Sequence, residues 1–223
     1  MPRRRGPSAT PSRFGRRGHV AAAVVVGYVI GTFPTADLVA SRVSGADLRS
    51  SGTGNPGAAN AAQVLGARAG AAVLLGDIAK GVAASVLGRS VGASAGAHLA
   101  GSAAVAGHCY PVWSGFRGGK GVATSVGQCL ATFPAYFPID VAVACATAAV
   151  PRWTQRAFAA TTVSSLCWIA GGVVWWRRGL ANAWGPTPSA LLPLSAALSS
   201  AMIVQRFVAS GPVGPPADRG PAR

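Results

Sequence analysis

The chain has 223 residues, of which half are apolar and only 11% are charged, with 30 Gly and 16 Pro. A soluble domain carries about a quarter charged residues, so this composition is typical of a membrane protein. The net charge of +15 does not indicate a nucleic-acid binder, because beyond the first 19 residues the basic side chains stand singly or in pairs between apolar runs.

The chain begins with a basic arm, residues 1–19, whose Pro, Ser and Gly content predicts disorder beside anionic lipid headgroups. An apolar stretch follows without a convincing cleavage site, so we interpret residues 20–41 as a membrane helix rather than a signal peptide. The tail at 207–223 is rich in Pro and Gly, and it too is predicted to be disordered.

The apolar runs predict an all-α integral membrane protein, because a bilayer core needs roughly 20 mostly apolar residues per helix. Spans are expected at 20–41, 64–88, 94–113, 121–137, 139–151, 157–176 and 187–205. Their many Ala and Gly residues allow close helix packing. We therefore expect a compact bundle of about seven transmembrane helices, with five or six as alternatives, forming one domain over residues 20–206.

The loop at 45–66 contains a run of turn-forming residues between the first two spans. Its core reads Gly52, Thr53, Gly54, Asn55, Pro56 and Gly57. Backbone N–H groups in such turns converge into anion-binding concavities, and Asn55 and Asn60 add side-chain donors. A phosphate site is one interpretation, and a tight interhelical connection that binds nothing is the other.

Asp77 and Lys80 stand three residues apart inside the second span, where one helical face brings them together. Ionisable groups at membrane depth are candidates for function, although a self-satisfied structural pair is an equal alternative.

A second glycine-rich loop follows His108 and combines close backbone approach with charge. Gly118 and Gly119 precede Lys120, and an apolar run then begins, so the loop is expected at a helix N-terminus that favours phosphate. It is not a P-loop, because Gly121 stands where Ser or Thr would hold magnesium. For His108 a satisfied interfacial role is the commoner alternative to a functional one.

The four cysteines, Cys109, Cys129, Cys145 and Cys167, lie far apart without metal-ligand spacing. We interpret them as small apolar side chains, and we expect no metal and no cofactor.

Several segments together resemble a known family. GTFPTADLVAS, GADLR, GTGNPGAANAAQVLG, GDIAKG and GHCYPVWSGFRGGKGVATSVG are similar, in order and spacing over residues 27–130, to the bacterial membrane acyltransferases that transfer a fatty acyl group from acyl phosphate to glycerol 3-phosphate. The resemblance implies production of lysophosphatidic acid for phospholipid synthesis, at the bacterial inner membrane. It implies no metal and no cofactor, and we expect no nucleic-acid or protein partner.

The resemblance also implies an orientation, with the N-terminus outside and the motif loops in the cytoplasm. The positive-inside rule divides on this point, because the basic arm favours the opposite orientation and the loops favour this one.

In the family pattern Thr53 occupies the position of a catalytic serine, and Lys120 binds phosphate. The expected catalytic residues are Thr53 and Lys120. The expected substrate-binding residues are Gly52, Gly54, Asn55, Gly57, Asn60, His108, Gly118, Gly119, Lys120 and Arg206.

The chain departs from that pattern at positions after the Gly52–Gly57 core of the first loop. Gln63 replaces an arginine, Ser200 a histidine and Ile203 an asparagine, while Gln155 and Phe158 fall where the family has serines. Two alternatives therefore stay open: a degenerate paralogue that binds phosphate-bearing lipid precursors without turnover, and a small anion transporter.

Overall fold

The computed structural model describes residues 13–153 and 155–210. These residues form α1 (Arg13–Gly31), α2 (Thr35–Val43), α3 (Ala58–Leu65), α4 (Ala67–Cys109), the 3₁₀ helix η1 (Val112–Ser114), α5 (Val122–Thr132), α6 (Phe137–Ala148), α7 (Arg156–Arg178) and α8 (Leu191–Ala209).

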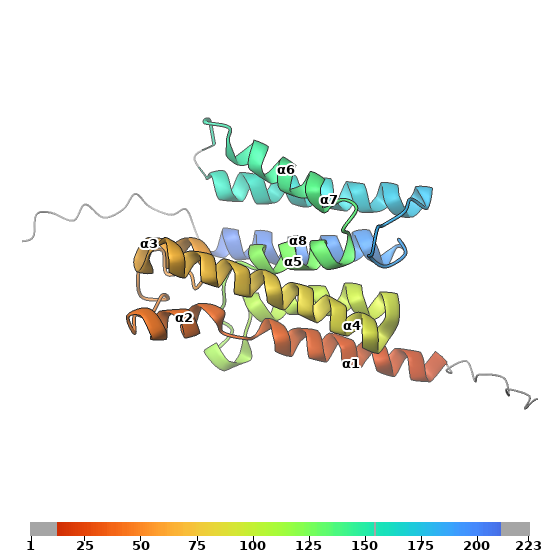
Figure 1. Cartoon of the computed structure of the whole chain (residues 1–223), viewed down its shortest axis with the longest axis horizontal. Coiled ribbons are helices and arrows are strands. Elements are labelled where there is room, and N and C mark those ends of the chain that lie inside the picture. The colour runs from red at the N-terminus through yellow and green to blue at the C-terminus, as the bar shows by residue number, and fades with distance from the viewer. Residues whose placement is uncertain (1–12, 154, 211–223) are drawn as a thin grey trace, which may run out of the picture.

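The long helices run side by side as a bundle, as Figure 1 shows. Helix α4 folds back on itself and forms two helical arms. The seven expected helices are therefore α1, the two arms of α4, and α5 to α8. The short helices α2 and α3 lie at one end of the bundle together with the end of α8, while α1 begins at the opposite end. The all-α fold and the helix count are confirmed.

The sequence-based boundaries need three corrections. The first span does not continue to residue 41, because Pro34 lacks an N–H donor and disfavours helix before it, so α1 ends at Gly31 and α2 begins at Thr35. Helix α1 already begins at Arg13, within the predicted arm, and α8 continues to Ala209, within the predicted tail. Residues 1–12 and 211–223 lie outside the described part of the chain.

The fold-back of α4 occurs at Gly92 and Ala93, whose φ values of −119° and 55° interrupt the helix. The two arms then meet at glycines, because a Cβ on Gly88 or on Gly96 would overlap the backbone of the other. The predicted spans 64–88 and 94–113 correspond to these two arms.

Small residues bring α1 against the second arm of α4. A Cβ on Gly27 would overlap the backbone of Ala100, a Cβ on Gly31 that of Ala104, and a Cβ on Gly107 the carbonyl of Tyr28. Helix packing in lipid depends on such close approach, so these glycines fit a membrane bundle.

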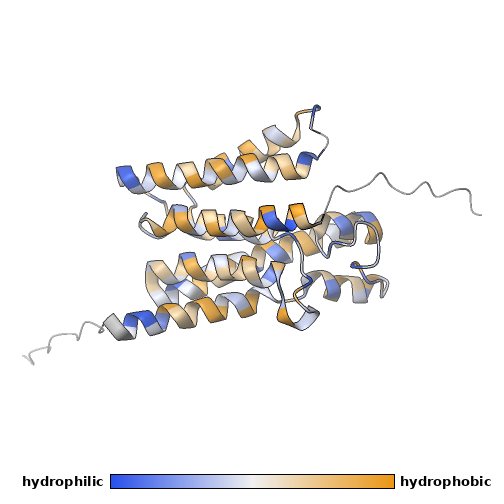
Figure 2. Ribbon diagram, turned by 180° about the vertical axis from the view of Figure 1, so that it is seen from behind, coloured by the Kyte–Doolittle hydropathy of each residue, from blue (hydrophilic) through white to orange (hydrophobic). Residues whose placement is uncertain are grey.

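Within the described part of the chain, four helical segments are long and apolar enough to cross a bilayer: Gly15–Val43, Ala67–Ser114, Arg156–Arg178 and Leu191–Ala209. Large apolar side chains such as Val25, Leu75 and Leu166 are exposed on their surfaces. Figure 2 shows that strongly hydrophilic residues gather mainly near the ends of the bundle.

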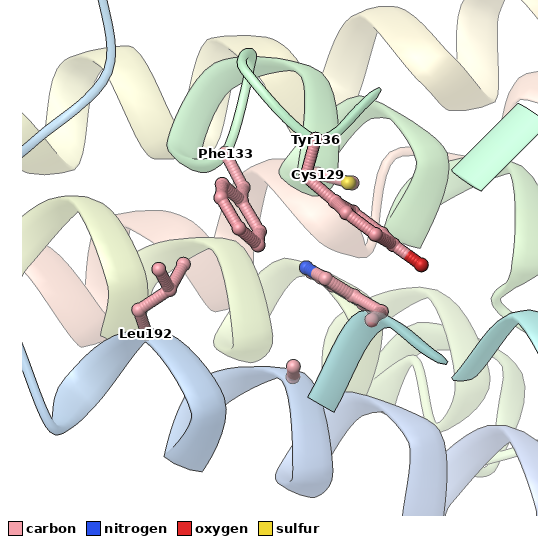
Figure 3. Close-up of a cluster of buried hydrophobic side chains, with 6 residues drawn as sticks. Cys129, Phe133, Tyr136 and Leu192 are labelled. Atoms are coloured by element: carbon pink, nitrogen blue, oxygen red, sulfur yellow. The ribbon is translucent and has the colours of Figure 1, made fainter. Parts of the chain in front are cut away.

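An aromatic cluster joins the segment after α5 to α7 and α8. Phe133 and Tyr136 stack with ring centroids 5.0 Å apart, and they pack with Cys129, Trp168 and Leu192 (Figure 3). This cluster anchors α7 and α8, and α8 carries Arg206 at the other end of the bundle.

Candidate active site

The two glycine-rich loops predicted from the sequence meet at one end of the bundle. Arg49, in the first loop ahead of its Gly52–Gly57 core, donates a hydrogen bond from Nε to the carbonyl of Arg117 in the second, at 3.0 Å. A cavity of about 290 Å³ lies between them and is lined by Pro56 from the first loop and by Gly118 and Gly119 from the second.

The first loop is held by Asn60, which is buried at the start of α3. Its Oδ1 accepts the N–H of Thr53 at 2.7 Å, and its Nδ2 donates to the carbonyls of Leu48 and Ser51 at 3.0 Å each. The side-chain donors of Asn60 are therefore engaged with the loop itself, and its role in this structure is to position Thr53.

The glycines of this loop have two kinds of constraint. Gly52 and Gly54 have φ values of +60° and +71°, which L side chains rarely adopt, and a Cβ on Gly52 would overlap Asn60 Oδ1. Gly57 instead caps α3 in an extended conformation, and a Cβ there would press on the side chain of Asn55. The loop consequently leaves Thr53 exposed and Asn55 half-buried.

Asn55 retains an unused acceptor. Its Oδ1 is buried and has no hydrogen-bond partner among the described residues. Such a group is available to a hydroxyl or N–H donor of a ligand.

The second loop is bonded to the last turn of α4. Gly118 donates its N–H to the carbonyl of Cys109 at 3.2 Å, and Gly119 donates to the carbonyl of His108 at 3.1 Å. A Cβ on Gly119 would overlap the His108 ring. These two amides are thus engaged within the fold, which leaves the side chains of Arg117 and Lys120 as the charges of this loop.

Arg206 holds the same loop from α8. Its Nε donates to the carbonyl of Gly119 at 3.1 Å and its Nη2 to the carbonyl of Gly118 at 2.6 Å. The guanidinium also lies over the ring of Tyr110, 5.6 Å from its centroid. Arg206, predicted as a substrate-binding residue, is here a tie between the glycine loop and α8.

Lys120 lies beside Arg206 at the start of α5. Its Nζ is 4.2 Å from the centroid of the Phe207 ring, and the side chain is partly buried. Burial and the neighbouring Arg206 guanidinium both lower the pKa of Lys120. Two cations in one place attract an anion, although neither Lys120 nor Thr53 lines the cavity between the loops.

The cavity contains the charged pair predicted in the second span. Asp77 Oδ1 lies 2.9 Å from Lys80 Nζ and 3.6 Å from His108 Nδ1, and all three side chains are buried. Lys80 also donates to the carbonyl of Phe33 at 3.2 Å. The predicted pair is present, with His108 as a third member.

Arg49 was not among the predicted site residues, yet it lines the cavity and pairs with Asp37 at 2.6 Å. Its only signal in the sequence is the GADLR segment, where nothing in the spacing distinguishes it from a loop anchor. Each of the two cations in the cavity thus has its own carboxylate, so the cavity is close to neutral, whereas Lys120 and Arg206 have no carboxylate partner among the described residues.

Comparison with known proteins identifies the family. The glycerol-3-phosphate acyltransferase family matches residues 21–209. The chain belongs to this family. It is 41% identical over 160 residues to the glycerol-3-phosphate acyltransferase of Desulforudis audaxviator, covering 70% of this chain and 80% of that one. It is 43% identical over 143 residues to that of Rubrobacter xylanophilus, covering 64% and 71%.

Two solved structures share the fold. Both are crystal structures of PlsY (YgiH), an integral membrane glycerol 3-phosphate acyltransferase. The glycerol 3-phosphate form aligns with a TM-score of 0.70 at 27% identity over 85% of this chain and 88% of that one. The lysophosphatidic acid form aligns with a TM-score of 0.67 at 26% identity, covering 84% and 87%. These findings confirm the resemblance, the acyltransferase class and the multi-pass membrane fold.

The positions where the chain departs from the family pattern have different environments. Gln63 is exposed on α3. Ile203 is buried in an apolar cluster with Val105 and Cys109, and Ser200 is buried with a hydroxyl that has no hydrogen-bond partner among the described residues. At Ile203, therefore, apolar packing stands where the resemblance implies a polar group.

Proposed function

We propose that the chain transfers a fatty acyl group from acyl phosphate to the sn-1 hydroxyl of glycerol 3-phosphate, giving lysophosphatidic acid and inorganic phosphate. The reaction takes place at the end of the bundle where the two glycine-rich loops meet. The observation that carries the proposal is the tie from Arg49 to the Arg117 carbonyl, beside the cationic pair Lys120 and Arg206.

The chemistry suits these residues. The hydroxyl oxygen forms a bond to the acyl carbonyl carbon while the bond from that carbon to the phosphate oxygen breaks, and the hydroxyl proton leaves with phosphate or to water. Phosphate is a good leaving group, so positioning and charge stabilisation supply most of the catalysis. Lys120 stabilises the phosphoryl charge, and Thr53 provides a hydroxyl at the first loop.

Both substrates carry phosphate, which matches the cations Arg117, Lys120 and Arg206 at this end of the bundle. The remaining polar loop groups, Asn55 above all, orient the glycerol backbone. The acyl chain lies along the apolar outer surface of the bundle, where large apolar side chains are exposed.

The site end faces the cytoplasm in this proposal. The loops and helix ends there carry Arg42, Arg49, Arg117, Lys120, Arg152 and Arg156. Positive loop residues favour the cytoplasmic side, and the soluble glycerol 3-phosphate is supplied there.

Product formation tests the proposal. Membranes containing the full chain, given acyl phosphate and radiolabelled glycerol 3-phosphate, should accumulate lysophosphatidic acid, and Lys120→Ala should reduce the rate at least tenfold. Arg152→Ala is the matched control, since Arg152 is an exposed cation at the same end whose side chain lies over the Trp153 ring, away from both glycine-rich loops. No product above the Lys120→Ala background would refute the proposal.

One observation favours a second candidate function. Apolar packing at Ile203 and the unpartnered hydroxyl of Ser200 remove part of the polar site that the resemblance implies. A chain that binds phosphate-bearing lipid precursors without turnover would show glycerol 3-phosphate binding by calorimetry and no product, which separates it from the enzyme.

A further inference from the structure

We infer that Asp77, Lys80 and His108 form a positioning bridge that holds the Gly118–Gly119 backbone and thereby sets Lys120 for phosphate binding. This inference rests on the proposed function and assigns a role to charged residues that lie inside the membrane-spanning segment.

The cluster of Asp77, Lys80 and His108 joins three segments of the chain. Asp77 and Lys80 belong to the first arm of α4, Phe33 to the connection between α1 and α2, and His108 to the end of the second arm. The contacts of 2.9, 3.2 and 3.6 Å connect all three segments. Buried charges are costly unless they are paired, so each member restricts where the others can lie.

The cluster reaches the second glycine-rich loop through His108. His108 contacts Gly119 twice, through its carbonyl, which accepts the Gly119 N–H at 3.1 Å, and through its ring, which fills the space of a Cβ. The orientation of the ring is set by Asp77 at Nδ1. A ring turned away from Asp77 would no longer support the loop at Gly119.

The second glycine-rich loop is also held by Arg206, and it leads directly to Lys120. The carbonyls of Gly118 and Gly119 are held by Arg206, so the loop is clamped between His108 on α4 and Arg206 on α8. Lys120 is the next residue along the chain, and its position depends on this clamp. The bridge therefore acts on phosphate binding through the position of Lys120, although Asp77, Lys80 and His108 also line the cavity.

The test compares substrate affinity with stability in the purified full chain. Asp77→Asn removes one charge, and Asp77→Asn with Lys80→Met removes both, so the double variant keeps the buried region neutral and preserves folding. Both should weaken binding of glycerol 3-phosphate and of inorganic phosphate about tenfold by calorimetry. Both should also raise the KM for glycerol 3-phosphate with little change in kcat.

Two further variants separate positioning from general stability. His108→Asn keeps a donor near Asp77 and should retain more affinity than His108→Ala. Asp140→Asn is the matched control, because Asp140 is also a buried carboxylate, bonded to Ser164 away from the loops, and its loss should leave phosphate affinity unchanged.

A double variant with the wild-type thermal midpoint and wild-type affinity for both probes would overturn the inference. A fall in affinity that Asp140→Asn reproduces would overturn it too, since it would then reflect stability alone. Because binding is measured without turnover, a wild-type chain that binds glycerol 3-phosphate but forms no product would refute only the proposed reaction. A wild-type chain that binds neither probe would overturn both.

Discussion

At the scale of single residues, Gly119 is a tightly constrained position of the site. It has no room for a side chain because the His108 ring fills that space, and both its N–H and its carbonyl are bonded. Its importance comes from close packing rather than from an unusual backbone conformation.

Gly119→Ala should therefore lower kcat/KM for glycerol 3-phosphate about ten- to a hundredfold, equivalent to about 1.4–2.7 kcal/mol. The new methyl group pushes the loop away from His108 and displaces Lys120. Steady-state kinetics in membranes measure the effect. Gly18→Ala on α1 is the control, because a Cβ there meets nothing within 4 Å, and activity equal to that control would contradict the packing argument.

Asn60→Ala should disorder the first loop. It removes three hydrogen bonds and leaves loop groups unsatisfied, at about 1–3 kcal/mol for each buried group. We expect lower activity and a thermal midpoint lowered by several degrees, measured on the same preparation. Asn60→Asp keeps the acceptor for Thr53, so its activity and thermal midpoint should lie between those of the wild type and of Asn60→Ala. An Asn60→Ala chain with wild-type activity and midpoint would show that the loop holds its shape without this residue.

The sequence predicted the two glycine-rich loops, because runs of glycine and other turn-forming residues are local patterns. It did not predict how they are used. The amides of Gly118 and Gly119 bond to α4, the donors of Asn60 bond to the loop, and Arg206 reaches back 87 residues to Gly119. Such pairings depend on tertiary contacts, which a local pattern does not contain.

At the scale of elements, a buried polar network ties α5 to the second arm of α4 and to α8. Gln128 donates to Ser102 Oγ at 3.1 Å and accepts from Ser199 Oγ at 2.7 Å. Lys120 lies just before α5 and Arg206 lies in the last turn of α8. The Gln128 network therefore helps to fix the relative positions of these two cations.

Gln128→Leu should destabilise the bundle by about 1–2 kcal/mol, since membrane hydrogen bonds contribute about 0.6 kcal/mol each and two hydroxyls lose a partner. The thermal midpoint in detergent reports this change. Thr161→Val serves as the control, because the Thr161 hydroxyl bonds only to the Ala157 carbonyl of its own helix and is exposed. A midpoint for Gln128→Leu equal to that of the control would contradict the prediction.

Helix boundaries show where sequence patterns were sufficient and where they were not. Hydropathy placed the two arms of α4 and the later helices, because lipid-facing stretches must be apolar. It missed the break at Pro34, which the missing N–H donor could have indicated, and it missed the helical start at Arg13, where basic residues adjoin an apolar run.

At the scale of the whole molecule, the path of the chain brings the loops at 44–57 and 110–121 and the segment 149–153 to one end and the segment 179–190 to the other (Figure 1). The proposed orientation places the first set in the cytoplasm. Hydropathy predicted that successive loops lie at alternate ends of the bundle. The basic residues at both ends left the orientation of the protein in the membrane undecided.

Cysteine labelling decides the direction. In a Cys145→Ser background, which removes the exposed native thiol, Trp184→Cys should react with a membrane-impermeant maleimide in intact cells. Arg152→Cys should react only after the membrane is opened. The reverse pattern would invert the proposed orientation.

The central claim is that the loop at Gly52–Gly57 and the loop at Gly118–Lys120 bind one substrate together. A structure of the full chain with glycerol 3-phosphate bound tests it most directly. We predict the phosphate within hydrogen-bond reach of Lys120 and the glycerol hydroxyls beside Thr53 or Asn55. A phosphate bound away from Lys120, or a substrate that contacts only one of the two loops, would contradict the account.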